Sequence, residues 1–203
     1  MQKIPMLYKK FFIDQGIERT TLFKNVRVKY ECDKALYPGS FTHVTPSFYF
    51  PEVVYLDLDK RCKKYFSENE TREFVKDKKE YSEEPIFRFY EESFENDIEE
   101  DYEYFDLIIS QFSGFISKYC TKYLRRNGIL LANDSHGDAT LAFTSGEYDL
   151  IGVINDEMEI EENNLEEYFT FSRKNEIDLD KVLKTMKGPK YKNMCYSYVF
   201  RKR

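Results

Sequence analysis

A tight turn and a carboxylate follow two neighbouring apolar runs in the segment 34–60. The turn occupies residues 38–40, and Asp57 comes after the second run, close to the roughly 20-residue spacing of a nucleotide site at a sheet edge. A glycine backbone can approach a ligand closely, and a carboxylate can accept hydrogen bonds from two neighbouring ribose hydroxyls. Alternatively, Asp57 and Asp59 only cap the helix that follows, and the residues leave both interpretations open.

The elements that would position these residues follow from the alternation of short apolar runs with longer amphipathic ones. This pattern predicts an α/β fold around a largely parallel sheet, with helices on both faces. We expect strands near 34–37, 53–57, 85–90, 105–111, 129–133, 148–154 and 193–201. We expect helices over 1–20, 70–81, 114–127, 164–171 and 178–186.

Length, charge and the pattern of apolar residues limit the classes of protein to which this sequence can belong. The 203 residues suit a single domain, with an N-terminal helical cap at 1–30, a core at 31–155 and the C-terminal part of the sheet at 156–203. A net charge of −6 disfavours broad nucleic-acid binding. The sequence has neither the roughly 18 to 20 apolar residues of a membrane span nor a signal peptide, so a cytoplasmic protein is expected. The four cysteines are scattered and are expected to be reduced thiols.

One histidine is a candidate general base. His136 follows the predicted strand at 129–133 and has Asp134 and Asp138 as sequence neighbours. Histidine titrates near neutrality, and a neighbouring carboxylate could orient its ring. A solvated or structural histidine is the alternative, and the spacing of these residues matches no defined metal site.

Several activities lack their motifs. The sequence contains no G-x-x-x-x-G-K-[ST], no G-x-G-x-x-G and no G-x-S-x-G, so a P-loop, a typical NAD site and a hydrolase elbow are not indicated. The segment SQFSG (110–114) lacks the Pro-Pro-aromatic motif of amino-directed nucleic-acid methyltransferases, and no Pro-Cys nucleophile of the cytosine-C5 type occurs.

In order and spacing, the motifs KALYPGSFTH, VVYLDLD, FRFYEES and FDLIISQFSGFISKYCTKYLRRNGILLAND resemble those of the class I S-adenosylmethionine-dependent methyltransferases. The resemblance covers about residues 34–135. It implies a Rossmann-like sheet, mostly parallel with a C-terminal antiparallel strand. It also implies that S-adenosylmethionine is the cofactor.

The resemblance also assigns roles to individual residues. Asp57 matches the ribose-binding acid, Phe41 and His43 stand where the family has its second and third glycines, and Tyr37 replaces an acid. The implied cofactor-binding residues are Tyr37, Pro38, Gly39, Ser40, Asp57, Leu58, Glu92, Ser93, Ser110 and Gln111.

Two functions are consistent with this pattern. The first is S-adenosylmethionine-dependent methyl transfer to an unidentified small-molecule or protein acceptor, with His136 as the candidate base. The alternative is a methyltransferase-like domain that no longer catalyses and binds a protein partner or a small ligand, as the glycine-poor loop suggests.

Overall fold

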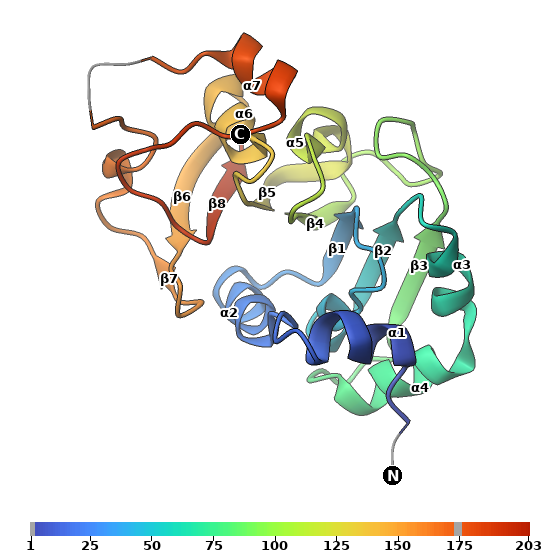
Figure 1. The fold of residues 1–203 in the computed structure, drawn as a ribbon. Helices are drawn as coiled ribbons and strands as arrows, with labels where there is room; N and C mark the ends of the chain where they lie inside the picture. Colours follow the sequence, from blue (N-terminus) through green and yellow to red (C-terminus); the bar gives the residue numbers. More distant parts are fainter. Residues whose placement is uncertain (1–2, 173–175) are drawn as a thin grey trace. The chain divides into compact units, whose positions relative to one another are not determined.

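The computed structural model describes residues 3–172 and 176–203. The chain divides into two compact units, Met1–Glu99 (unit 1) and Glu100–Arg203 (unit 2), and Figure 1 traces both in colours that follow the sequence. The expectation of a single domain stays a prediction.

Unit 1 contains three parallel strands in the order β3-β2-β1. They are β1 (Lys34–Pro38), β2 (Glu52–Leu56) and β3 (Ile86–Tyr90), and they confirm the first three predicted strands. Pro38 pairs with Leu56, and Leu56 pairs with Tyr90, so the three strands end at one level. Residues that directly follow the strands are therefore brought to one edge of this sheet.

The helices of unit 1 differ partly from the prediction. They are α1 (Met6–Tyr8), a π-helix (Lys9–Ile13), α2 (Thr20–Tyr30), a 3-10 turn (Thr45–Phe48), α3 (Lys60–Ser67) and α4 (Asn69–Lys78). The helix predicted at 70–81 is confirmed as α4. The single helix predicted over 1–20 is wrong, because the first helical stretch ends at Ile13 and α2 begins only after Arg19, which has a left-handed φ of 57°.

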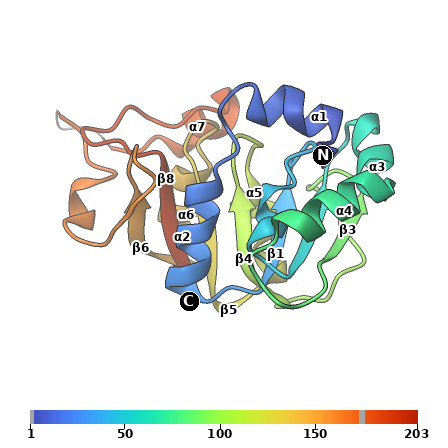
Figure 2. The same cartoon turned by 90° about the horizontal axis from the view of Figure 1, so that it is seen from below.

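The connection from β1 to β2 has no α-helix. It contains only the 3-10 turn, and all residues from 42 to 50 are buried. Figures 1 and 2 show α2 and α4 on the same face of the unit 1 sheet, and the 3-10 turn contacts β2, α2 and α4. The loop after β1 is therefore part of the core of unit 1.

Unit 2 contains strands in the order β4-β5-β8-β6-β7. They are β4 (Phe105–Ser110), β5 (Leu124–Ala132), β6 (Tyr148–Ile154), β7 (Ile160–Glu161) and β8 (Ser197–Lys202). β4 and β5 are parallel, whereas β8 is antiparallel to both β5 and β6. The prediction of a mostly parallel sheet with an antiparallel C-terminal strand is confirmed.

The helix predicted over 114–127 is wrong in most of its length. Only α5 (Ile116–Tyr119) is an α-helix, a 3-10 turn follows, and β5 already begins at Leu124. Asn127 has a left-handed φ of 61°, and the pairing of β4 with β5 shifts register close to Phe105. Asn127 and Gly128, at the end of the predicted helix, thus belong to an irregular strand, where they allow a bulge.

The remaining helices of unit 2 are α6 (Asp138–Ser145) and α7 (Leu179–Thr185). The prediction missed α6, which contacts α5, β6 and β8. α7 confirms the helix expected at 178–186, but the helix expected at 164–171 is only a 3-10 turn (Leu165–Glu167). All four cysteines are free thiols, as expected. Among the residues that the structure describes, none of the helices is long and apolar enough to cross a bilayer.

Candidate functional site

The turn after β1 is held against the end of β2. The Gly39 N–H donates a hydrogen bond to the Leu56 carbonyl oxygen at 2.7 Å, and the Ser40 N–H approaches the same oxygen at 3.4 Å. Gly39 has a left-handed φ of 65°, a conformation that glycine adopts at little cost. The glycine is therefore required by the backbone geometry of this turn.

Asp57 fixes the next residue of the same loop. Its Oδ2 accepts a hydrogen bond from the Phe41 N–H at 2.7 Å, and its Oδ1 accepts one from the Asp59 N–H at 2.8 Å. The N-cap of α3 is Asp59, whose Oδ1 accepts a hydrogen bond from the Arg61 N–H at 2.9 Å. The capping interpretation thus holds for Asp59, whereas Asp57 is a half-buried carboxylate oriented by two backbone amides. A carboxylate has further lone pairs, so it can accept additional hydrogen bonds.

Phe41 occupies the position of the second family glycine. Its φ is 47°, and its ring packs edge-on against Phe11 with the centroids 5.1 Å apart. The Arg61 guanidinium lies 4.6 Å from the Phe41 ring centroid and is also bonded to the Asp59 carboxylate. The side chain therefore connects the loop to the N-terminal segment and to α3.

His43 occupies the position of the third family glycine and is buried. Its ring stacks on Phe12 at 4.3 Å, its Nε2 lies 3.0 Å from the Glu18 carbonyl oxygen, and its Nδ1 lies 3.0 Å from the Tyr37 hydroxyl. Since a carbonyl oxygen only accepts hydrogen bonds, Nε2 carries the proton and Nδ1 accepts from Tyr37. Burial, assisted by the charge of Arg19, lowers the pKa of His43 to about 3. His43 is thus a neutral residue of the core.

The residues expected near an adenine lie after β3. Glu92 accepts hydrogen bonds from the Ser93 N–H and the Asn96 side chain, both at 2.8 Å, and these bonds lower its pKa. Leu58, which follows Asp57, is 65% exposed. In unit 1 the Gly39 turn is therefore bonded to Leu56, and the next residue of the loop, Phe41, is bonded to Asp57. Glu92 and Ser93 form a separate local turn.

In unit 2, Ser110 at the end of β4 contributes to a buried polar cluster. Its Oγ donates to Asp138 Oδ2 at 2.5 Å, and Ser117 donates to Asp138 Oδ1 through Oγ at 2.6 Å and through its N–H at 3.0 Å. Asp138 is 1% exposed, and burial raises its pKa to about 6. The cluster joins β4, α5 and α6.

Gln111 is also buried. Its Nε2 donates to the Ser197 Oγ on β8 at 3.0 Å, and its Oε1 lies 3.5 Å from the Asn133 Nδ2 after β5. Ser110 and Gln111 are thus engaged in the packing of unit 2.

His136 is not oriented by either neighbouring aspartate, so that expectation is wrong. Asp134 accepts hydrogen bonds from the Thr140 N–H and Oγ1, both at 2.8 Å, and Asp138 bonds to the two serines described above. Within the described residues, the hydrogen-bond partner of His136 is the Ser135 Oγ, 3.0 Å from Nδ1. The imidazole is half-buried in the loop before α6.

Sequence reasoning missed the structural role of Asp138. Its acidity and its place two residues after His136 suggested a partner for that histidine. The useful signal was the position of Gly137, which has a left-handed φ of 87° and precedes α6 directly. Acidic residues are favoured in the first turn of a helix.

Comparison with known proteins identifies the fold. No family model and no curated protein matches the sequence. A solved structure from Methanococcus maripaludis, named as a candidate S-adenosyl-L-methionine-dependent methyltransferase, aligns over 97% of this chain and 89% of its own with 12% identity and a TM-score of 0.52. A SAM-dependent methyltransferase from Thermotoga maritima aligns over 97% and 93% with 10% identity and a TM-score of 0.51.

A third solved structure, YcgJ from Bacillus subtilis, is matched over only part of its length. The alignment covers 60% of this chain and 54% of YcgJ, with 17% identity and a TM-score of 0.41. The chain thus spans about half of YcgJ. The two longer alignments show that this chain has the class I methyltransferase fold.

Proposed function

We propose that the protein is an S-adenosylmethionine-dependent methyltransferase that acts on an unidentified acceptor. The observation that carries this proposal is the Asp57 carboxylate, which two backbone amides hold beside the Gly39 turn at the level where β1, β2 and β3 end. Carboxylates with fixed geometry suit ribose hydroxyls, because the carboxylate itself loses little conformational freedom when the ligand binds. The fold shared with proteins named as methyltransferases supports the same proposal.

Different residues of this chain would contact different parts of the cofactor. In this proposal residues 37–40 approach the ligand with backbone, and Asp57 and Leu58 contact the ribose. Glu92 and Ser93 flank the adenine. The sulfonium of the bound cofactor supplies the reactive methyl group. The protein contributes alignment and, through His136, a base for an acceptor that must lose a proton.

The residues that follow the Gly39 turn in the same loop, Phe41 and His43, favour a second candidate function. The Phe41 amide already occupies one acceptor position of Asp57, and Phe41 and His43 join the loop to the N-terminal segment. A loop closed in this way suits a methyltransferase-like domain that does not catalyse and instead binds a protein partner or a small ligand.

Titration calorimetry with S-adenosylmethionine and S-adenosylhomocysteine separates the two functions. We expect wild-type protein to bind both, and Asp57→Asn to weaken binding by about 1.5 to 3 kcal/mol through loss of a charged acceptor. Asp59→Asn is the matched control, because it makes the same change two residues away at a helix cap. No heat from either ligand at millimolar concentration, with folded protein, would favour the second function.

A further inference from the structure

Unit 2 contains a pocket formed by α7 and the segment 187–190. Its volume is about 900 Å³, and Phe171 and Val182 contribute apolar walls. That volume is in the range of small-molecule sites.

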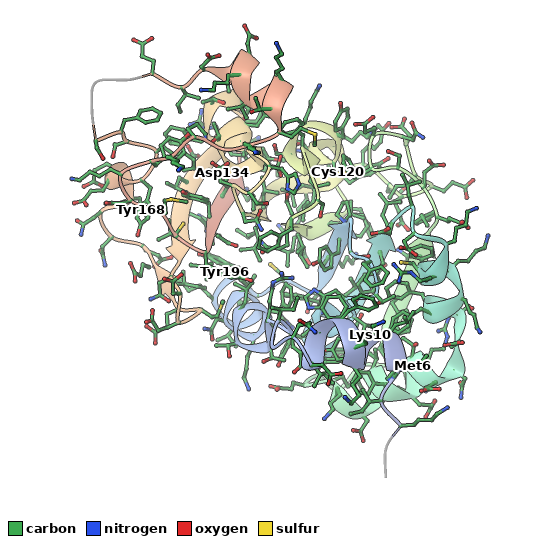
Figure 3. All side chains as sticks on the ribbon, in the orientation of Figure 1. Met6, Lys10, Cys120, Asp134, Tyr168 and Tyr196 are labelled. Carbon is green, nitrogen blue, oxygen red and sulfur yellow. The ribbon has the colours of Figure 1, made fainter. Side chains whose placement is uncertain are left out.

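Two residues of the pocket lining, Gly188 and Val182, pack against the turn that precedes α6. A Cβ atom at Gly188 would overlap the Asp134 carboxylate, and one at Gly137 would overlap Val182. Thr140 fixes Asp134 through two hydrogen bonds and shares a third with Tyr191 at 2.8 Å. Figure 3 labels Asp134, beside the red segment that leads from α7 to β8. The pocket is therefore built on a hydrogen-bonded framework.

Three lysines line the pocket, namely Lys181, Lys187 and Lys190. In residues 3–172 and 176–203 none of them forms an ion pair, unlike Lys3 and Lys24, which lie 2.7 Å from Glu70 and Glu80.

The carboxylates of the same pocket are Glu176 and Asp178. Asp178 is the N-cap of α7, since its Oδ1 accepts a hydrogen bond from the Lys181 N–H at 2.9 Å. The three lysines therefore outnumber the two carboxylates of the lining by one, and a concave surface strengthens the attraction of a lysine for an anion.

An aromatic ring lies in the same lining. Phe171 is half-buried and packs on Tyr191 with the ring centroids 5.1 Å apart, so its position is supported from behind. Such a ring offers a flat apolar surface for stacking. We propose that this pocket binds a small organic anion with an aromatic part, with the phosphate or carboxylate at the lysines and the ring against Phe171. This binding does not depend on methyl transfer.

Phenyl phosphate is a suitable probe, with inorganic phosphate and phenol as its two halves. Titration followed by backbone amide NMR shifts should place phenyl phosphate at α7 and residues 187–190, with weaker binding of phosphate and still weaker binding of phenol. Equal affinity for phenyl phosphate and phenol would overturn the role of the lysines.

Paired variants test the charges. Lys187→Gln with Lys190→Gln should weaken phenyl phosphate binding by about tenfold or more, since two charge-assisted contacts are lost. Lys184→Gln with Lys192→Gln removes the same charge from exposed neighbours outside the pocket lining and should change the affinity by about twofold or less. Thermal unfolding shows whether each variant is folded. No binding at millimolar phenyl phosphate, or equal losses in the two folded double variants, would overturn the proposal.

Discussion

Asp57 in unit 1 and Asp138 in unit 2 are both carboxylates close to the end of a strand, but their surroundings differ. Asp57 is half-buried, and its hydrogen bonds come from the backbone amides of Phe41 and Asp59. Asp138 is fully buried, and its oxygens are bonded to Ser110 and Ser117. Donors from two other elements enclose Asp138 and make it part of the core. The two backbone donors of Asp57 orient the carboxylate but leave it half-buried, so it can still meet a ligand.

The largest expected effect is the loss of the buried acid. Asp138→Ala removes the acceptor from Ser110 and Ser117 and leaves their donors buried, which should lower the free energy of unfolding by about 3 kcal/mol or more. Asp149→Ala is the control, because it breaks an exposed ion pair with Arg203 and should cost less than about 1 kcal/mol. Urea unfolding measures both. Equal losses would show that the buried cluster contributes no more than a surface pair.

The same acid should give stability a pH dependence. The pKa of Asp138 is raised to about 6 in the folded protein, above its value near 3.9 in the unfolded chain. Between these values the folded state holds a proton that the unfolded state has lost, so this group makes stability fall as pH rises from about 4 to about 6. The slope is at most about 1.4 kcal/mol per pH unit.

Asp138→Asn isolates this contribution, because asparagine does not titrate. Between pH 4 and pH 7 the free energy of unfolding should fall less steeply with rising pH for the variant than for wild type. Parallel curves would mean that Asp138 does not hold a proton in this range.

The turn at Gly39 should combine a stability effect with a binding effect. Gly39 and Gly16 both have a φ of 65°, so alanine at either position should cost about 1 to 2 kcal/mol. Gly16 has open space around its Cα, and Gly39 lies in the candidate site. We expect only Gly39→Ala to abolish binding of S-adenosylhomocysteine, measured by calorimetry. Loss of binding in both variants would point to a general effect on unit 1.

The smallest expected change tests the glycine-poor loop. Phe41 has a φ of 47°, so Phe41→Gly should relieve backbone strain while losing contacts with Phe11 and Arg61, and the net change in stability should stay within about 1 kcal/mol. Phe41→Ala removes the ring and keeps the strain. If the ring limits access of the cofactor, both variants should bind S-adenosylhomocysteine more tightly than wild type. Weaker binding by both would show that the ring helps to form the site.

Some of this architecture could be predicted from the sequence, because it follows from the pattern of neighbouring residues. Strands such as β2 and β4 are short apolar runs that are buried along nearly their whole length, so their positions were predicted within one or two residues. The helix expected over 114–127 failed because apolar residues at helical spacing are buried equally well in a turn and an irregular strand.

In the candidate site, too, some features could be predicted from the sequence and others could not. The place of Asp57 at the end of β2 could be predicted from the apolar run, and the turn at residues 38–40 could be predicted from its residue types. The hydrogen bond from the Phe41 amide to Asp57 could not be predicted from the sequence, because it depends on how a loop without an α-helix folds back over the strand end. The stacking of His43 on Phe12 was equally inaccessible, since it joins two segments that are distant in sequence.

A crystal structure with S-adenosylhomocysteine would show whether Asp57 and the Gly39 turn form a cofactor site. We expect ribose hydroxyls within hydrogen-bonding distance of the Asp57 carboxylate and cofactor atoms against the Gly39 backbone, with the Phe41 ring still on Phe11. A structure from crystals soaked at millimolar ligand in which the Phe41 ring fills the space between Gly39 and Asp57, with no cofactor there, would contradict it.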